Sequence, residues 1–304
     1  MQKNRWTLWD YLRVGLGPLQ KGILVGIDTT YRCNLNCRHC YFRPQGYSAE
    51  LPADQWVVRL QALKDQGFPL CVCGWLGGEP LLRPEVIEAG KGFFKTNVVF
   101  TNGTRELPNW PDCRFVVSVP GDSSLYGELT GGNETLYATV KEHASRPDLN
   151  VLVAYCITRR NVASIPDFLS EWRKTGVKGV YFEFYTPSRG ENGELCLDWP
   201  ERDLAIDTLL CLKKSFGDFI YTPSLLLRLM KTDTVRGILS ACRAKDTQLS
   251  LDPMGNPKSP CQLGPASDCS RCGCMLPIWS FLLWRKRLLL LAFAEGVWRE
   301  IRGV

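Results

Sequence analysis

Three cysteines, Cys33, Cys37 and Cys40, stand within eight residues, directly after an apolar run at residues 22–27 that is typical of a buried strand. Thiolates are soft ligands that select iron–sulfur clusters or zinc. A zinc site would need a fourth ligand, and His39, wedged between two of the cysteines, is poorly placed to share one tetrahedral ion with them. A [4Fe–4S] cluster held by three cysteines instead leaves one iron open. The spacing therefore favours a cluster at which chemistry takes place.

More candidate residues follow the predicted strands that come after this loop. Two of them are the glycines Gly77 and Gly78, which lack a side chain and let the main chain approach a ligand closely. The candidates are Gly77-Gly78-Glu79-Pro80 after a strand at 69–76, Thr101-Asn102-Gly103 after 97–100, Ser118 near the end of 115–119, and Asn161 after 151–157. Because the carboxyl ends of parallel strands meet on one face of a barrel, these residues are expected at one site.

The Cys-x3-Cys-x2-Cys spacing, with these motifs in this order, resembles the radical S-adenosylmethionine (SAM) superfamily. The resemblance implies that the three cysteines hold a [4Fe–4S] cluster whose fourth iron binds the amine and carboxylate of SAM. It implies that His39 packs beside the adenine and that Ser118 contacts the ribose or carboxylate, with a serine that only satisfies backbone groups as the alternative. The SAM-binding residues expected from the resemblance are His39, Gly77, Gly78, Glu79, Asn102, Ser118 and Asn161.

Six predicted strands, the last at 179–185, alternate with helical segments, which indicates a parallel sheet with right-handed crossovers. The resemblance makes this an α/β fold, a partial (β/α)6 TIM-like barrel with a small cysteine-rich extension. Helices are expected at 53–67, 84–91, 135–144, 166–175, 199–216 and 223–230. The expected organisation is an N-terminal helix at 1–20, the barrel at 21–235, the extension at 236–275 and a C-terminal helix at 276–304.

A second group of cysteines follows the predicted barrel. Between its first two members, residues 249–257 alternate in polarity and contain Asp-Pro and Gly-Asn pairs, which predicts a small hairpin. Hairpin and cysteines together resemble the twitch or SPASM extensions of radical SAM maturases, although the gap from glycine to cysteine is longer by one than usual. The resemblance implies one auxiliary [4Fe–4S] cluster, and a structural zinc is the alternative. Four of five residues would be its ligands: Cys242, Cys261, Cys269, Cys272 and Cys274.

Both ends of the chain are rich in apolar and basic residues. Residues 1–20 repeat apolar side chains at helical spacing, which predicts a helix over the barrel floor or, alternatively, one that faces a membrane. Residues 276–304 hold two apolar stretches separated by Arg285-Lys286-Arg287, and neither stretch is long enough to span a bilayer. A helix docked on the barrel and an interfacial helix with peripheral membrane contact are both open for this tail.

Composition limits the compartment and the partners. The chain has 304 residues and 14 cysteines, too long to need disulfide staples, and its first residues show no signal peptide. We therefore expect reduced thiols in a cytoplasmic protein, with membrane association as the alternative. Cys71 and Cys73 are expected to be small buried strand residues. The net charge of +6 is modest and no basic run is interleaved with aromatics, so nucleic acid is not expected as a partner. Only His39 and His143 could supply an imidazole.

The resemblance implies that the protein is a radical SAM oxidoreductase or maturase. It would cleave SAM reductively to a 5′-deoxyadenosyl radical, with electrons from a reductant such as flavodoxin or ferredoxin. That radical would abstract hydrogen from a peptide or cofactor-precursor substrate in an oxidation or cross-link. Modification or adenosylation of a lipid such as a hopanoid is the first alternative, because the layout and the apolar, basic tail would suit it. A non-catalytic iron–sulfur or zinc binding protein is the second.

Overall fold

Seven parallel strands form one curved sheet in the computed structural model, which describes residues 20–46, 49–191 and 193–285. The order across the sheet is β6-β5-β4-β3-β2-β1-β7, so β6 and β7 are its two edges. The strands are β1 (Leu24–Asp28), β2 (Val72–Leu76), β3 (Thr96–Thr101), β4 (Cys113–Ser118), β5 (Asn150–Ile157), β6 (Val180–Phe184) and β7 (Gln248–Leu251).

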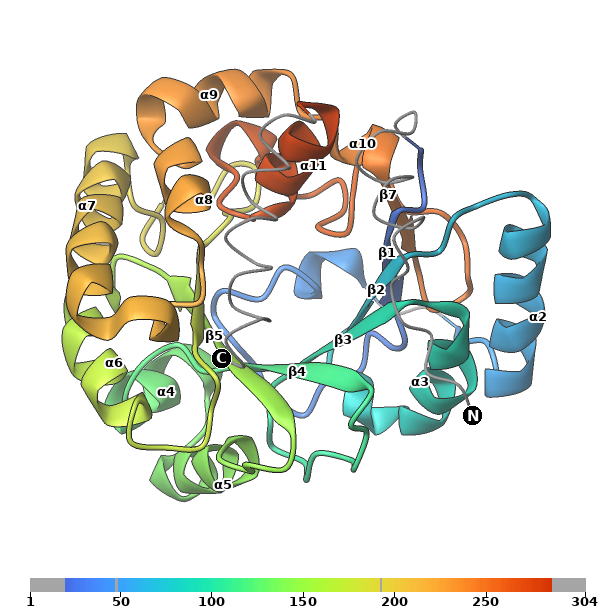
Figure 1. Ribbon diagram of the computed structural model, residues 1–304, viewed down its shortest axis with the longest axis horizontal. Helices are drawn as coiled ribbons and strands as arrows, with labels where there is room; N and C mark the ends of the chain where they lie inside the picture. Colours follow the sequence, from blue (N-terminus) through green and yellow to red (C-terminus); the bar gives the residue numbers. More distant parts are fainter. Residues whose placement is uncertain (1–19, 47–48, 192, 286–304) are drawn as a thin grey trace.

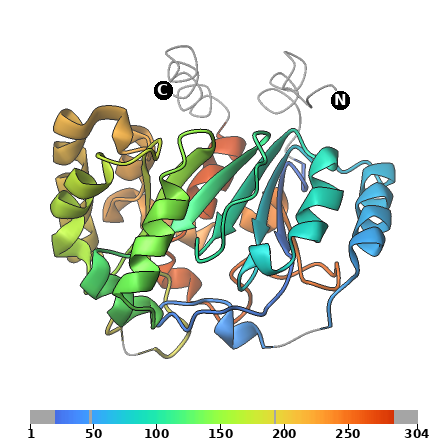
Figure 2. The same ribbon diagram turned by 90° about the horizontal axis from the view of Figure 1, so that it is seen from below.

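Helices cover the outer face of this sheet, and the lumen lies on its inner face (Figures 1 and 2). Local sequence explains several helix ends. The longest of the described helices begins at a capping box formed by Asp198 and Glu201, and α4 ends at Gly131, whose φ of 75° suits glycine. The helices are α2 (Ala53–Asp65), α3 (Pro84–Gly90), α4 (Ser123–Thr130), α5 (Glu134–Ala144), α6 (Ile165–Trp172), α7 (Trp199–Phe216), α8 (Ser224–Leu229), α9 (Thr232–Ser240), α10 (Ala244–Thr247) and α11 (Leu276–Trp284).

The predicted partial barrel is confirmed, and all six expected strands are present within a few residues of their expected bounds. The expected hairpin at 249–257 is corrected in part. Its first arm is β7, a seventh parallel strand that pairs with β1, and after a turn at Asp252 to Gly255 its second arm returns for one antiparallel bridge between Leu251 and Pro257. Pairing with β1, about 220 residues earlier, is a long-range contact that local polarity does not report.

One apolar region lies on each side of the sheet. The main core fills the space between the strands and the outer helices, with Trp56, Trp75 and Trp172 fully buried in it. A smaller cluster occupies the lumen and includes Val116 and Leu152. Because neighbouring residues of a strand face opposite sides, the lumen receives every second residue, and polar residues there stand out.

The cysteine-rich segment after β7 fills the opening between the two sheet edges. On the β6 side, the Phe184 backbone N–H donates to the Gly273 carbonyl at 3.0 Å, and the Asp268 N–H donates to the Pro187 carbonyl at 2.8 Å. On the β7 side, the Lys258 N–H donates to the Ser250 carbonyl at 2.8 Å. The segment thus joins the two edges and forms one wall of the lumen.

The described part of the C-terminal segment is α11, which packs against α9 and α10 and buries Leu276, Ile278, Leu282 and Leu283. This agrees with the docked alternative for residues 276–284. The expected helix at 1–20 and the second apolar stretch of the tail lie outside the described residues, apart from residue 20. Among the described helices, none combines the length and the apolar character that crossing a membrane requires.

Candidate active site

The three-cysteine loop runs along the carboxyl edge of the barrel, between β1 and α2, and its cysteines line one cavity of about 360 Å³. Backbone bonds hold the loop: the Asn36 N–H donates to the Thr130 carbonyl at 3.2 Å, and the Arg38 N–H donates to the Leu129 carbonyl at 2.9 Å. The Arg38 guanidinium also pairs with Glu128 and Glu194 on the outside. The loop is therefore fixed to the end of α4 although it has no regular secondary structure of its own.

The chemistry of this loop fits an iron–sulfur cluster. Burial, with the neighbouring Cys40 and Cys33 thiols as smaller causes, raises the pKa of Cys37 to about 12. Three thiols so close together resist ionisation unless a cation compensates their charge, and a coordinating metal deprotonates a thiol outright. Among the described residues, no group of three or more His, Cys, Asp or Glu side chains is arranged to hold a single metal ion. A [4Fe–4S] cluster would supply the compensating positive charge, with each thiolate bound to a different iron.

Gly77 and Gly78 bring the β2 loop against the cysteine loop. The Gly78 N–H donates to the Thr30 carbonyl at 2.8 Å, and the Glu79 N–H donates to the Arg32 carbonyl at 2.9 Å. A Cβ at position 78 would lie 2.2 Å from the Arg32 oxygen, and one at position 77 would lie 2.4 Å from the Thr30 oxygen. Only glycine permits this approach, so these two residues position the cysteine loop as well as lining the cavity.

Glu79 does not line the cavity. Its buried carboxylate accepts from the Leu81 N–H at 2.9 Å, the Thr101 hydroxyl at 2.8 Å and the Asn102 N–H at 2.7 Å. Burial raises the pKa of Glu79, although these three bonds act in the opposite direction. The side chain ties β2 to the end of β3, and only its backbone is available for the role that the resemblance implies.

Asn102, Ser118 and His39 all line the cavity. The Asn102 amide donates to Asn34 Oδ1 at 2.9 Å and approaches Cys33 Sγ at 3.7 Å, which links the end of β3 to the cysteine loop. Burial lowers the pKa of His39 to about 4, so its imidazole is neutral, and its Nδ1 has no hydrogen-bond partner among the described residues. A neutral ring with a free ring nitrogen could face a planar group such as an adenine.

Asn161, the last of the residues expected to bind SAM, does not line this cavity. It is fully buried, and its side chain accepts from the Thr158 N–H at 2.7 Å and donates to the carbonyls of Pro120 at 2.7 Å and Cys156 at 2.9 Å. These bonds use both ends of the amide to shape the loop after β5. A contact to SAM would need an amide that the structure has already committed to backbone.

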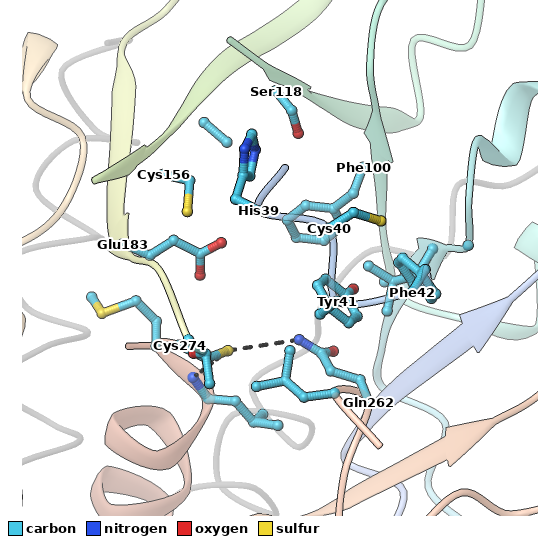
Figure 3. Close-up of a pocket in the computed structure, with 18 of the residues that line it drawn as sticks. His39, Cys40, Tyr41, Phe42, Phe100, Ser118, Cys156, Glu183, Gln262 and Cys274 are labelled. Carbon is cyan, nitrogen blue, oxygen red and sulfur yellow. Dashed lines mark hydrogen bonds between the residues drawn. The ribbon is translucent and has the colours of Figure 1, made fainter. Parts of the chain in front are cut away.

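The five later cysteines gather between β6 and β7. Burial raises the pKa of Cys272 and Cys261, and in each case other cysteines of the group lie close enough to raise it further. A buried Arg202 on α7 holds the segment by donating to the Cys272 carbonyl at 3.1 Å and the Arg271 carbonyl at 2.6 Å. Among these cysteines, Cys274 lines the cavity, where Gln262 donates to its sulfur at 3.7 Å (Figure 3).

Several cavity residues were missed by the sequence analysis. Cys156 on β5 and Glu183 on β6 are paired in register and both face the lumen, as does Tyr41 beside the cysteine loop (Figure 3). Burial raises the pKa of Glu183 to about 7. Its position between two phenylalanines in an apolar strand was a usable signal, because a charged residue on the inward face of a buried strand is rarely structural.

The protein is an α/β partial barrel of the kind that could hold iron–sulfur clusters. It has a three-cysteine loop on its carboxyl edge and a second cysteine group in the wall of the lumen. The family model described as Radical SAM superfamily matches residues 27–189, more than half of the chain. The chain therefore belongs to the radical SAM superfamily. This superfamily uses a [4Fe–4S] cluster and SAM, and its relatives with twitch or SPASM extensions carry additional clusters.

Individual relatives match about half of the chain. Sporulation killing factor maturation protein SkfB of Bacillus subtilis is 26% identical over 168 residues, 49% of this chain and 39% of SkfB. Pre-heme d1 synthase of Dinoroseobacter shibae is 27% identical over 169 residues, 51% of this chain and 41% of that protein. The chain thus spans about two fifths of the length of these curated relatives.

A solved structure supports the fold. Streptococcus suis SuiB bound to precursor peptide SuiA aligns with a TM-score of 0.56 at 16% identity, over 86% of this chain and 65% of SuiB. At this identity the likeness concerns the arrangement of the barrel and not the reaction.

Proposed function

We propose that this protein is a radical SAM maturase that modifies a peptide by hydrogen abstraction. One observation carries the proposal: a single cavity extends from the three-cysteine loop at one side to Cys274 of the second cysteine group at the other. A substrate in that cavity would lie between two sites able to hold redox groups. Such an arrangement suits an oxidation or cross-link, in which both hydrogen and an electron leave the substrate.

In this proposal the chain's own residues bind and orient the cofactors. Cys33, Cys37 and Cys40 hold the first cluster, and the backbone at Gly77 and Gly78 meets the amino group of SAM. His39, Asn102 and Ser118 line the cavity where the nucleoside and methionyl groups would lie. When bound, the cluster and SAM supply one-electron cleavage to methionine and a 5′-deoxyadenosyl radical, with the electron from a reductant such as flavodoxin or ferredoxin.

The extension at 236–275 is proposed to hold one auxiliary cluster with four of its five cysteines, and zinc is the alternative. The apolar cavity walls have a second role, because they keep water and stray hydrogen donors away from a radical. Phe42, Phe100, Tyr181 and Trp279 are among the residues that form these walls.

Peptide substrates are favoured by the relatives. SkfB is named as a maturation protein, and SuiB is described with a bound precursor peptide. A cofactor precursor is the second candidate, because pre-heme d1 synthase matches over a similar share of the chain. Lipid modification, the alternative suggested by the apolar tail, has no observation among the described residues in its favour.

Anaerobic turnover tests these candidates. The reconstituted protein is incubated with SAM, dithionite and one of three additions: a peptide encoded next to its gene, a tetrapyrrole precursor, or vesicles of a hopanoid lipid. We expect 5′-deoxyadenosine to rise with the peptide, and the peptide to lose about two mass units for each net two-electron oxidation. A rise only with the tetrapyrrole or only with the vesicles would contradict the proposal and select the other substrate class.

A further inference from the structure

Glu183 is a cavity residue that the cofactors leave unexplained. It lies on β6, in register with Cys156 on β5, and its carboxylate points into the space between Cys156, His39 and Cys274 (Figure 3). This places it between the three-cysteine loop and the cysteine-rich wall. A group in that position meets whatever fills the middle of the cavity.

The carboxylate has no counterion. Among the described residues that line the cavity, Glu183 is the only carboxylate, and none is a lysine or arginine. No ion pair joins Glu183 to any other part of the chain that the structure describes, and the backbone N–H of Met275 is the donor that lowers its pKa against the effect of burial. A carboxylate in an apolar cavity without a cation lowers the stability of the fold. Its presence is therefore better explained by ligand binding than by folding.

A second acceptor that lines the cavity has an oxygen without a partner in the part of the chain that the structure describes. Gln248 on β7 is 5% exposed, and its amide nitrogen donates to Gln262 Oε1 at 2.9 Å. Its own Oε1 is buried without a partner among the described residues, and Gln248 lines the cavity. Buried acceptors are normally satisfied, so an unpartnered amide oxygen beside a cavity indicates a donor that arrives with a ligand.

The cysteine-rich wall contacts the two strands that carry these acceptors, and hydrogen bonds hold it at both ends. Lys258, paired with the buried Asp28 carboxylate, donates to the Gln262 carbonyl at 2.7 Å, which fixes the residue that orients Gln248. At the other end, the Gly273 N–H donates to the Thr186 hydroxyl at 2.9 Å. Acceptors held in advance bind a donor without a further ordering cost.

We propose that Glu183 is a specificity-determining residue that binds a cationic side chain of the peptide substrate, an ammonium or guanidinium group, with Gln248 as an additional acceptor. This inference rests on the proposed peptide function. The charge of Glu183 would hold that side chain midway between the three-cysteine loop and Cys274, so the residue chosen for hydrogen abstraction would be the cationic residue or its neighbour.

Capped pentapeptides of alanine with lysine, norleucine or glutamate at the centre are suitable probes, because lysine and norleucine differ by the ammonium group. Binding to the anaerobic, SAM-loaded holoenzyme is measured by equilibrium dialysis. We expect wild type to bind the lysine probe about tenfold more tightly than the norleucine probe, as for a desolvated charge pair, and to bind the glutamate probe least. Glu183→Gln should abolish the lysine preference while leaving the norleucine affinity unchanged.

The matched control is Glu106→Gln, which changes a carboxylate that is 80% exposed outside the cavity and should retain the full preference. Equal binding of the lysine and norleucine probes by wild type, or retention of the preference in Glu183→Gln, would overturn the inference. Formation of 5′-deoxyadenosine is measured in parallel, on peptide-free samples of the same protein preparations. Wild type that forms it but shows no preference loses only this inference, whereas wild type that cannot form it contradicts the proposed function.

Discussion

Replacing Gly273 with alanine should release the cysteine-rich wall from β6. A Cβ at this position would lie 2.2 Å from the Phe184 carbonyl oxygen and 2.6 Å from Phe184 Cβ, well inside ordinary contact. The backbone would have to move by about 1 Å to relieve an overlap of this kind. That shift would break the bond from the Phe184 N–H to the Gly273 carbonyl and the bond from the Gly273 N–H to Thr186, which are 3.0 and 2.9 Å long.

Two lost hydrogen bonds, at about 1 kcal/mol each, and a similar amount of residual strain give a cost of about 2–4 kcal/mol. Cys272 and Cys274 flank Gly273, so the second metal site should fail first. We expect iron in the reconstituted protein to fall from about eight to about four atoms per chain, with formation of 5′-deoxyadenosine retained.

The assay combines anaerobic iron analysis with urea unfolding, and Gly237→Ala is the matched control. A Cβ at position 237, inside α9, would meet nothing within 4 Å, so alanine there should stabilise the helix by up to about 1 kcal/mol. If Gly273→Ala keeps the iron content and the unfolding midpoint of wild type, the argument that this close approach positions the second site is wrong.

Three further predictions concern the first site and the lumen. Gly78→Ala should abolish SAM cleavage by displacing the cysteine loop, since its Cβ would lie 2.2 Å from the Arg32 oxygen; wild-type rates of 5′-deoxyadenosine formation would refute this. Asn161→Ala should lower the free energy of unfolding by about 2–4 kcal/mol, because buried backbone groups lose their partner, and should leave SAM affinity in equilibrium dialysis unchanged; a loss of SAM affinity at full stability would instead support a direct contact. The folded-state pKa of Glu183 is about 7, above its ordinary value of 4.5, so its contribution to stability is greatest below pH 4.5 and is lost as the pH rises through 7. Glu183→Gln should therefore be more stable than wild type by about 1–2 kcal/mol at pH 8, after allowance for solvent in the cavity, with a smaller gain at pH 5.5 in urea unfolding; a loss of stability at pH 8 would contradict this. The titratable groups near Glu183 are Tyr41, Cys156, Tyr181 and Cys274.

For the first site, the prediction depends on local sequence alone. Cys33, Cys37 and Cys40 lie in one short loop, and Gly77-Gly78 follows a recognisable strand, so spacing along the chain carries most of their arrangement. The barrel could be predicted for a similar reason, because each strand and helix has its own periodicity and crossovers have one preferred hand.

Contacts between distant segments could not be predicted. The parallel pairing of β7 with β1 depends on where the chain returns after α9, and the place of Gln248 and Cys274 in the cavity depends on that pairing. The hydrogen bonds of Asn161 could not be predicted either: its position after a strand predicts a ligand contact, whereas in the structure its amide bonds to three backbone groups. Which side of a loop an amide faces is decided by packing and not by its place in the sequence.

The central claim is that two cysteine groups hold two clusters on one cavity and that the first cleaves SAM. Anaerobic iron and sulfide analysis with EPR, in the presence of SAM and dithionite, tests it most directly in wild type and in a triple variant with Cys33→Ala, Cys37→Ala and Cys40→Ala. We predict about eight irons per chain in wild type and about four in the variant, with 5′-deoxyadenosine formed only by wild type. A wild-type protein that holds only zinc and forms no 5′-deoxyadenosine would contradict the account.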